Sequence, residues 1–80
     1  MPEEVLFKTE ATVSRDEIAD ALADAAEQVR SGTVTLESAT DEQTVELPAE
    51  PTFEMELERI TDSETGEEYY ELEYEMSWTE

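Results

Sequence analysis

The sequence contains no cysteine and no histidine among its 80 residues. The first absence excludes disulfide bonds, and the two together remove the commonest transition-metal ligands and nucleophilic catalytic systems. No apolar run approaches the ~18 residues of a membrane span. The acidic start, MPEEV, also lacks the basic region of a signal peptide. We therefore expect a cytoplasmic protein with no cofactor, no bound metal and no membrane partner.

Positive charge is almost as scarce. Four Lys and Arg residues face 24 Asp and Glu residues, which gives a formal net charge of −20. A chain with this charge repels the phosphates of nucleic acids and anionic lipids, so neither is an expected partner. Two interpretations remain, a disordered acidic segment and a folded domain adapted to concentrated salt. Strong periodicity of the apolar residues favours the folded domain, which we expect to be a single one over residues 1–80.

Two elements are predicted in the first 32 residues. Apolar side chains alternate along residues 5–13, the period-2 pattern of a strand with one buried face. Ser14 and Glu17 then have the spacing of a reciprocal capping box, which marks the start of a helix. Apolar residues recur on one face of the following segment, and Gly32 can adopt the left-handed conformation that ends a helix.

The rest of the sequence predicts two hairpins. In the first, with a turn near Thr40 and Asp41, pairing Val34 with Leu47 and Leu36 with Val45 keeps all four apolar residues on one face. The prolines of PAEP interrupt the ladder. The second hairpin turns near SETG, where Gly66 can take a positive φ. Its expected register places Leu57 opposite Leu72, Met55 opposite Tyr74 and Phe53 opposite Met76.

These elements together predict an α+β fold. We expect two layers, a mostly antiparallel five-stranded sheet with one helix on one face, in the order β-α-β-β-β-β. Such a sheet is roughly 20 Å wide, whereas one helix is only ~10 to 12 Å across. The helix therefore leaves part of the apolar face open, and a second copy or another protein is expected to cover it. The residues of this predicted interaction face are Phe53, Met55, Tyr70, Leu72, Tyr74, Met76 and Trp78.

The second hairpin also places glutamates directly opposite one another on its other face, as Glu54 with Glu75, Glu56 with Glu73 and Glu58 with Glu71. Each pair costs roughly 0.8 kcal/mol at ~5 Å and the permittivity of water. The screening length is ~10 Å at 0.1 M salt and ~3 Å at 1 M, so only molar salt screens these pairs effectively. The arrangement indicates a halophilic protein.

The order of these segments resembles a known family. EVLFKTEATVSRDEIADALADAAEQV, GTVTLES, VELP and a closing acidic hairpin that ends in ELEYEMSW are similar to the amphi-Trp domain of small haloarchaeal and some bacterial proteins. The resemblance extends from about Glu4 to Trp78, the tryptophan to which the family name refers. It implies a halophilic source and a domain of uncharacterised function, and it identifies no catalytic residues.

Three classes of function are compatible with these patterns. The apolar face favours a non-catalytic homodimer or protein-interaction module. The net charge alone is also compatible with an acidic binder of a basic protein, or nucleic-acid mimic, although a halophilic surface produces the same charge without a partner. A carboxylate-based enzyme is the third class, but the hairpin glutamates lie on the predicted solvent face. We therefore predict that the chain is not an enzyme, with no catalytic, cofactor-binding or metal-binding residues.

Overall fold

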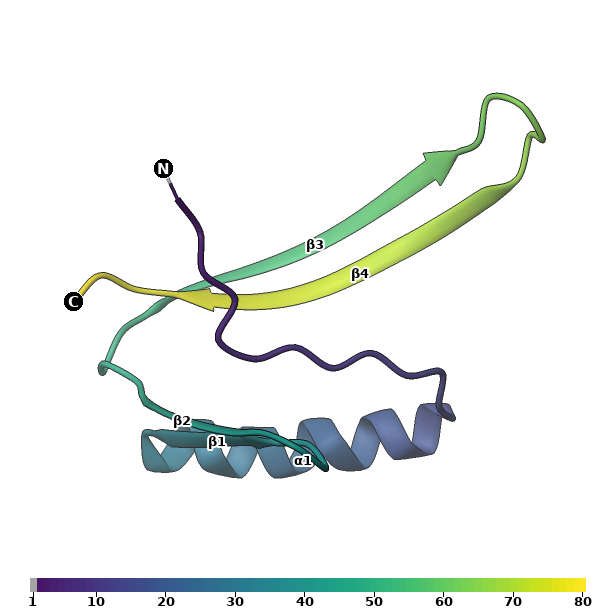
Figure 1. Cartoon of the computed structure of the whole chain (residues 1–80). Coiled ribbons are helices and arrows are strands. Elements are labelled where there is room, and N and C mark those ends of the chain that lie inside the picture. The colour runs from purple at the N-terminus through teal and green to yellow at the C-terminus, as the bar shows by residue number, and fades with distance from the viewer. Residues whose placement is uncertain (1) are drawn as a thin grey trace. The chain divides into compact units, whose positions relative to one another are not determined.

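The computed structural model describes residues 2–80, which form one helix and four strands in the order α-β-β-β-β. The chain divides into two compact units, one ending at Ala49 and the other comprising Glu50–Glu80. The first contains the helix and a two-stranded antiparallel sheet, and the second is a long β-hairpin (Figure 1). The elements are α1 (Arg15–Ser31), β1 (Thr33–Glu37), β2 (Glu42–Glu46), β3 (Thr52–Thr61) and β4 (Glu68–Ser77).

The predicted five-stranded sheet is therefore wrong. Two separate two-stranded sheets take its place, and residues 5–13, predicted as the opening strand, form neither helix nor strand. An alternating pattern indicates that a segment can form a strand with one apolar face. It does not indicate which other strand would bond to the backbone N–H and C=O groups of that segment. Each observed sheet joins strands that are consecutive in the chain, where a short loop makes pairing inexpensive in entropy. The opening segment has no such neighbour in sequence.

The start of α1 agrees with the predicted cap. Ser14 has extended backbone angles, and its Oγ accepts a hydrogen bond of 3.1 Å from the backbone N–H of Glu17. Asp16 and Glu17 follow in the first turn, where negative charge interacts favourably with the positive end of the helix dipole. Local chemistry alone therefore determines where this helix begins.

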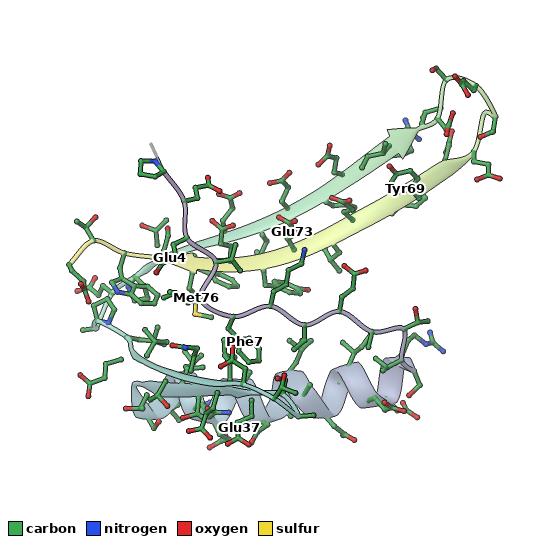
Figure 2. The ribbon with its side chains drawn as sticks, viewed as in Figure 1. Glu4, Phe7, Glu37, Tyr69, Glu73 and Met76 are labelled. Atoms are coloured by element: carbon green, nitrogen blue, oxygen red, sulfur yellow. The ribbon has the colours of Figure 1, made fainter. Side chains whose placement is uncertain are left out.

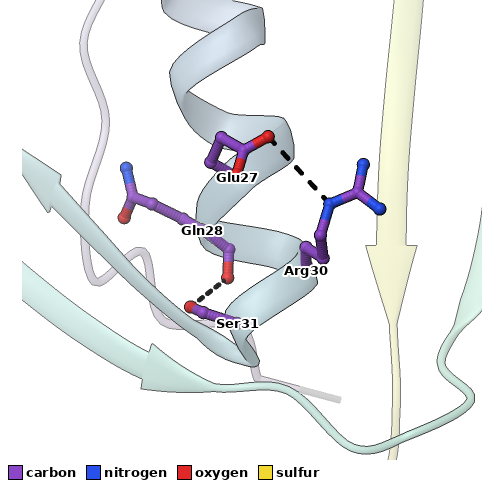
Figure 3. Close-up of polar contacts among 4 residues, drawn as sticks. All are labelled: Glu27, Gln28, Arg30 and Ser31. Atoms are coloured by element: carbon purple, nitrogen blue, oxygen red, sulfur yellow. Dashed lines mark hydrogen bonds and ion pairs between the residues drawn. The ribbon is translucent and has the colours of Figure 1, made fainter.

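The end of α1 is also as predicted. Gly32 has φ 91°, and its N–H donates to the carbonyls of Gln28 and Val29 at 3.0 and 3.1 Å. Figure 3 shows the last turn, where the Ser31 hydroxyl donates to the Gln28 carbonyl at 2.7 Å and Arg30 lies 4.0 Å from Glu27. Both charged side chains are more than three-quarters exposed, so this ion pair contributes little stability.

The β1–β2 hairpin has a different register from the predicted one. Val34 lies opposite Val45, and Leu36 lies opposite Gln43, a shift of two residues. The turn explains the difference, because the Ser38 N–H donates to the Asp41 carbonyl at 2.8 Å and places the turn at Ala39 and Thr40, one residue earlier than expected. A shift of two residues preserves the face on which each side chain lies. The apolar residues therefore still share one face.

A glutamine of the helix bonds to the outer edge of β1. Gln28 Oε1 accepts a 2.7 Å hydrogen bond from the backbone N–H of Thr35, while Gln28 Nε2 donates to Asp24 at 2.9 Å. The paired hydroxyls of Thr35 and Thr44, 3.1 Å apart, lie at the same level of the ladder. Because Gln28 satisfies a donor that β2 does not reach, it joins helix and sheet within this unit.

Replacement of Gln28 by alanine is expected to lower the free energy of unfolding by about 1 kcal/mol, because the Thr35 N–H loses its acceptor. Urea denaturation in molar KCl measures the loss, and hydrogen exchange of the Thr35 amide should accelerate. The matched control is Asp24→Ala, which removes the other partner of Gln28 but leaves the bond to Thr35. Equal losses in the two variants would contradict a specific role for the contact with β1.

The β3–β4 hairpin has the predicted register throughout. Leu57 pairs with Leu72, Met55 with Tyr74 and Phe53 with Met76, as the alternating pattern indicated. In the connecting turn, Asp62 Oδ1 accepts from the N–H groups of Glu64 and Thr65 at 2.8 and 3.2 Å. Gly66 has φ 76°, and its N–H donates to the Asp62 carbonyl at 2.9 Å. This turn fixes the register of the ten-residue strands.

In the described part of the chain, no helix is long and apolar enough to cross a membrane.

Candidate interaction surface

The register divides the side chains of β3–β4 between two faces with contrasting chemistry. Directly opposite residues of an antiparallel pair lie on the same face, and successive residues alternate between faces. Figure 2 labels one residue of each kind on β4, Glu73 and Met76, whose side chains leave the ribbon on opposite sides. One face is mostly apolar and the other mostly acidic.

We call the apolar face of this hairpin the apolar stripe. Phe53 and Tyr74 stack within it, with ring centroids 6.2 Å apart and ring planes 4° from parallel. The stripe is solvent-exposed, with exposed fractions from 36% at Met76 to 70% at Leu57. No residue within Glu50–Glu80 is buried, so the hairpin has no core of its own. Its members are Phe53, Met55, Leu57, Tyr70, Leu72, Tyr74, Met76 and, one residue beyond the strand, Trp78.

We call the opposite side the acidic face. Its three glutamate pairs lie in register as predicted, Glu54 with Glu75, Glu56 with Glu73 and Glu58 with Glu71. Ile60 and Tyr69 form the next pair toward the turn, which explains why two tyrosines are adjacent in the sequence: Tyr69 belongs to this face and Tyr70 to the apolar stripe (Figure 2 labels Tyr69).

The residues of the apolar stripe and those of the acidic face form different kinds of cross-strand pair. The Asp62 N–H donates to the Glu67 carbonyl at 2.8 Å, which makes these two residues a hydrogen-bonded pair. Since hydrogen-bonded and non-hydrogen-bonded pairs alternate, the glutamate pairs are hydrogen-bonded, with Cα atoms about 5.5 Å apart. The apolar pairs are non-hydrogen-bonded, at about 4.5 Å. This phase brings the apolar side chains closer together and holds the opposed carboxylates farther apart.

Comparison with known protein families gives one match. The profile of the Amphi-Trp domain matches residues 1–80, the whole chain. The chain belongs to the Amphi-Trp domain family. No curated protein and no solved structure matches it. The family match confirms the resemblance inferred from the segment order, and it indicates no function.

All seven predicted interaction-face residues of this Amphi-Trp domain fall on the apolar stripe. The register brings together the six that lie within β3 and β4, and Trp78 continues the alternation after Ser77. The prediction omitted Leu57, although its pairing with Leu72 was expected. Leu57 is 70% exposed and belongs to the same surface. The signal that identifies it is the register itself, because a residue directly opposite a member of the face must share that face.

One basic side chain lies beside the stripe. Arg59 pairs in register with Tyr70, and it is the only Lys or Arg in residues 50–80 of the Amphi-Trp domain. The acidic face therefore has no basic residue of its own hairpin to neutralise it. Within residues 2–80, no group of three or more acidic residues is arranged to hold a metal ion. The Asp62 carboxylate is engaged by the backbone of the turn.

Proposed function

We propose that this Amphi-Trp domain is a non-catalytic association module, in which the apolar stripe packs face to face against the same stripe of a second copy. The observation that carries the proposal is the stripe itself, eight large side chains on one face of a two-stranded sheet. A lone two-stranded hairpin is marginally stable in water, and it gains stability when a further layer covers its apolar face. A second copy supplies such a layer with matching chemistry.

The size of the stripe is sufficient for a dimer. With ~200 Å² for a large side chain, the exposed fractions leave about 900 Å² of the stripe accessible on each copy. Two copies that covered most of this surface would bury about 1,600 Å², the size of a standard specific interface. A patch this large exceeds the few hundred Å² that monomeric proteins usually expose.

Charge favours this mode of dimerisation over others. A two-fold axis through the stripe places the same patch on both copies, and the acidic faces then point away from the interface. Side-by-side association of the hairpins would instead add a second set of glutamates beside the first. The face-to-face arrangement therefore buries apolar area while keeping the like charges apart.

The proposed setting is the cytoplasm of a halophilic cell. Opposed glutamates with no basic neighbour on their face support this proposal, since they favour an environment of molar salt. The net charge of −20 supports the absence of nucleic-acid and anionic-membrane partners. The non-catalytic part of the proposal is supported by a composition without cysteine or histidine.

The oligomeric state in molar salt tests the proposed function. In about 2 M KCl, where surface charges are screened, light scattering is expected to give twice the 9.1 kDa mass of one chain. Dilution should shift the mass toward one chain and move the Trp78 fluorescence to longer wavelength as the stripe becomes hydrated. A concentrated sample that remained a monomer in this salt would contradict the proposal.

A further inference from the structure

The outer edge of β4 is an unpaired row of backbone donors and acceptors. Within residues 2–80, β3 and β4 pair only with each other. The hydrogen bond from Asp62 to Glu67 fixes the phase of the ladder, so the N–H and C=O groups of alternate residues point outward. On β4 the outward groups belong to the apolar-stripe residues Tyr70, Leu72, Tyr74 and Met76, preceded by Glu68.

This edge lacks the devices that usually prevent strand addition. Edge strands are commonly short, bulged, covered by another element or interrupted by proline or lysine. β4 is ten residues long, continuously paired, and contains neither proline nor lysine. The contrast with β1 is direct, because the Gln28 side chain covers the outward N–H of Thr35 there. Gln28 therefore supplies an acceptor at the edge of β1, whereas no strand within residues 2–80 pairs with the outer edge of β4.

Charge decides which strand this edge can accept. Glu71, Glu73 and Glu75 project from the acidic face of β4, and β4 contains no basic residue. Strands pair at about 4.8 Å, so a second β4 would place like charges side by side, whereas alternating Lys or Arg would place opposite charges there. β3 is the less favourable edge for a basic strand, because it contains Arg59.

We propose that the outer edge of β4 binds, as a third strand, an extended segment of a partner protein in which basic residues alternate with aliphatic or aromatic ones. The backbone of the segment bonds to the outward groups of β4. Its basic side chains lie beside Glu71, Glu73 and Glu75, and its apolar side chains widen the apolar stripe. Main-chain bonds supply affinity, and the alternation of charge and apolar groups supplies specificity.

This proposal goes beyond the face-to-face dimer, because the edge lies in the plane of the sheet and the dimer uses its face. The two proposals therefore fail separately. Strand addition to a monomer would support the edge and contradict the dimer, and a dimer that bound no basic segment would do the reverse.

The test uses the full chain and synthetic peptides of about ten residues, the length of β4. One peptide alternates Lys and Val. A second has the same composition with the lysines grouped at one end, and a third alternates Glu and Val. Isothermal titration is performed at about 0.5 M KCl, where the screening length of roughly 4 Å still permits contacts between adjacent charges. We expect the alternating Lys peptide to bind at least about tenfold more tightly than either control.

Two variants locate the bound peptide. Leu72→Pro removes an outward N–H of β4, and Leu57→Pro makes the same change at the register partner on β3. Neither N–H is used within the hairpin, so circular dichroism should show the strands retained in both. We expect binding to be lost in Leu72→Pro and kept in Leu57→Pro. Hydrogen exchange of the unaltered chain gives an independent measurement, in which the peptide should protect the amides of Tyr70, Leu72 and Tyr74.

Several results would overturn the proposal. Equal binding of the grouped-lysine peptide would show only bulk attraction to an acidic chain, and equal binding of the Glu peptide would remove the role of charge. Protection of the β3 amides in place of those of β4 would show that the peptide binds to the edge of β3 and that the proposed edge is wrong. Protection of the β4 amides without peptide, rising with protein concentration, would identify a second copy as the occupant.

Discussion

Leu72→Glu is expected to convert the dimer into a monomer in molar salt. Leu72 lies in the middle of the apolar stripe, opposite Leu57 and between Tyr70 and Tyr74 on the same face. A carboxylate there would lie in the centre of the interface without a partner, and burying an unpaired charge costs several kcal/mol. The dissociation constant should therefore increase by at least about a thousandfold.

The matched control for this substitution is Glu73→Gln. It changes the neighbouring residue of the same strand but leaves the apolar stripe intact, because residue 73 projects from the acidic face. Sedimentation equilibrium should show a monomer for Leu72→Glu and a dimer for Glu73→Gln, while circular dichroism shows β structure in both. If Leu72→Glu remained dimeric with its strands formed, the stripe would not be the interface.

The second large expected effect is stabilisation by salt. Unfolding by urea is expected to require about 2 kcal/mol more free energy in 2 M than in 50 mM KCl, because three opposed glutamate pairs each cost roughly 0.8 kcal/mol in water without screening. The carboxylates of these pairs separate when the hairpin unfolds, so repulsion destabilises mainly the folded state. Equal stability in the two salt concentrations would contradict this account of the acidic face.

A pair of double variants separates this local repulsion from net charge. Glu56→Gln with Glu73→Gln removes the middle pair of the acidic face, and Glu3→Gln with Glu4→Gln makes the same change in net charge outside the strands. The first variant should be more stable than the parent in 50 mM KCl and depend less on salt. The second should change little. Equal effects would indicate that total charge, and not the cross-strand register, sets the dependence on salt.

Several features of this Amphi-Trp domain could be predicted from local sequence. Ser14 and Gly32 define the ends of the helix. The Ser14 side chain accepts a hydrogen bond from a free N–H of the first turn, and Gly32 adopts the left-handed conformation in which its own N–H bonds to carbonyls of the last turn. The β3–β4 register was predictable because a slip of one residue would mix glutamates with aromatic residues on both faces, and the turn expected near SETG, where Gly66 has a positive φ, distinguishes it from slips of two residues. The predicted interaction face follows from that register, and only Leu57 was left out of it.

The register of β1–β2 could not be predicted from the alternation of apolar residues. A slip of two residues keeps Val34, Leu36 and Val45 on one face, so the apolar pattern is equally satisfied by both registers. The Ser38–Asp41 hydrogen bond selects one of them. The contact between Gln28 and Thr35 was also missed, because the six intervening residues must first form a helix end and the start of a strand.

The sequence by itself determined the elements whose partners lie nearby in the chain: one capped helix, two hairpins, and a long strand pair with one apolar and one acidic face. The tertiary structure alone decided how many strands join in one sheet. Residues 5–13 have the alternation of a strand but no strand pairs with them, so the two hairpins remain separate sheets. The reason is physical, because alternation specifies which face a strand presents, whereas pairing depends on whether another backbone edge is available to it.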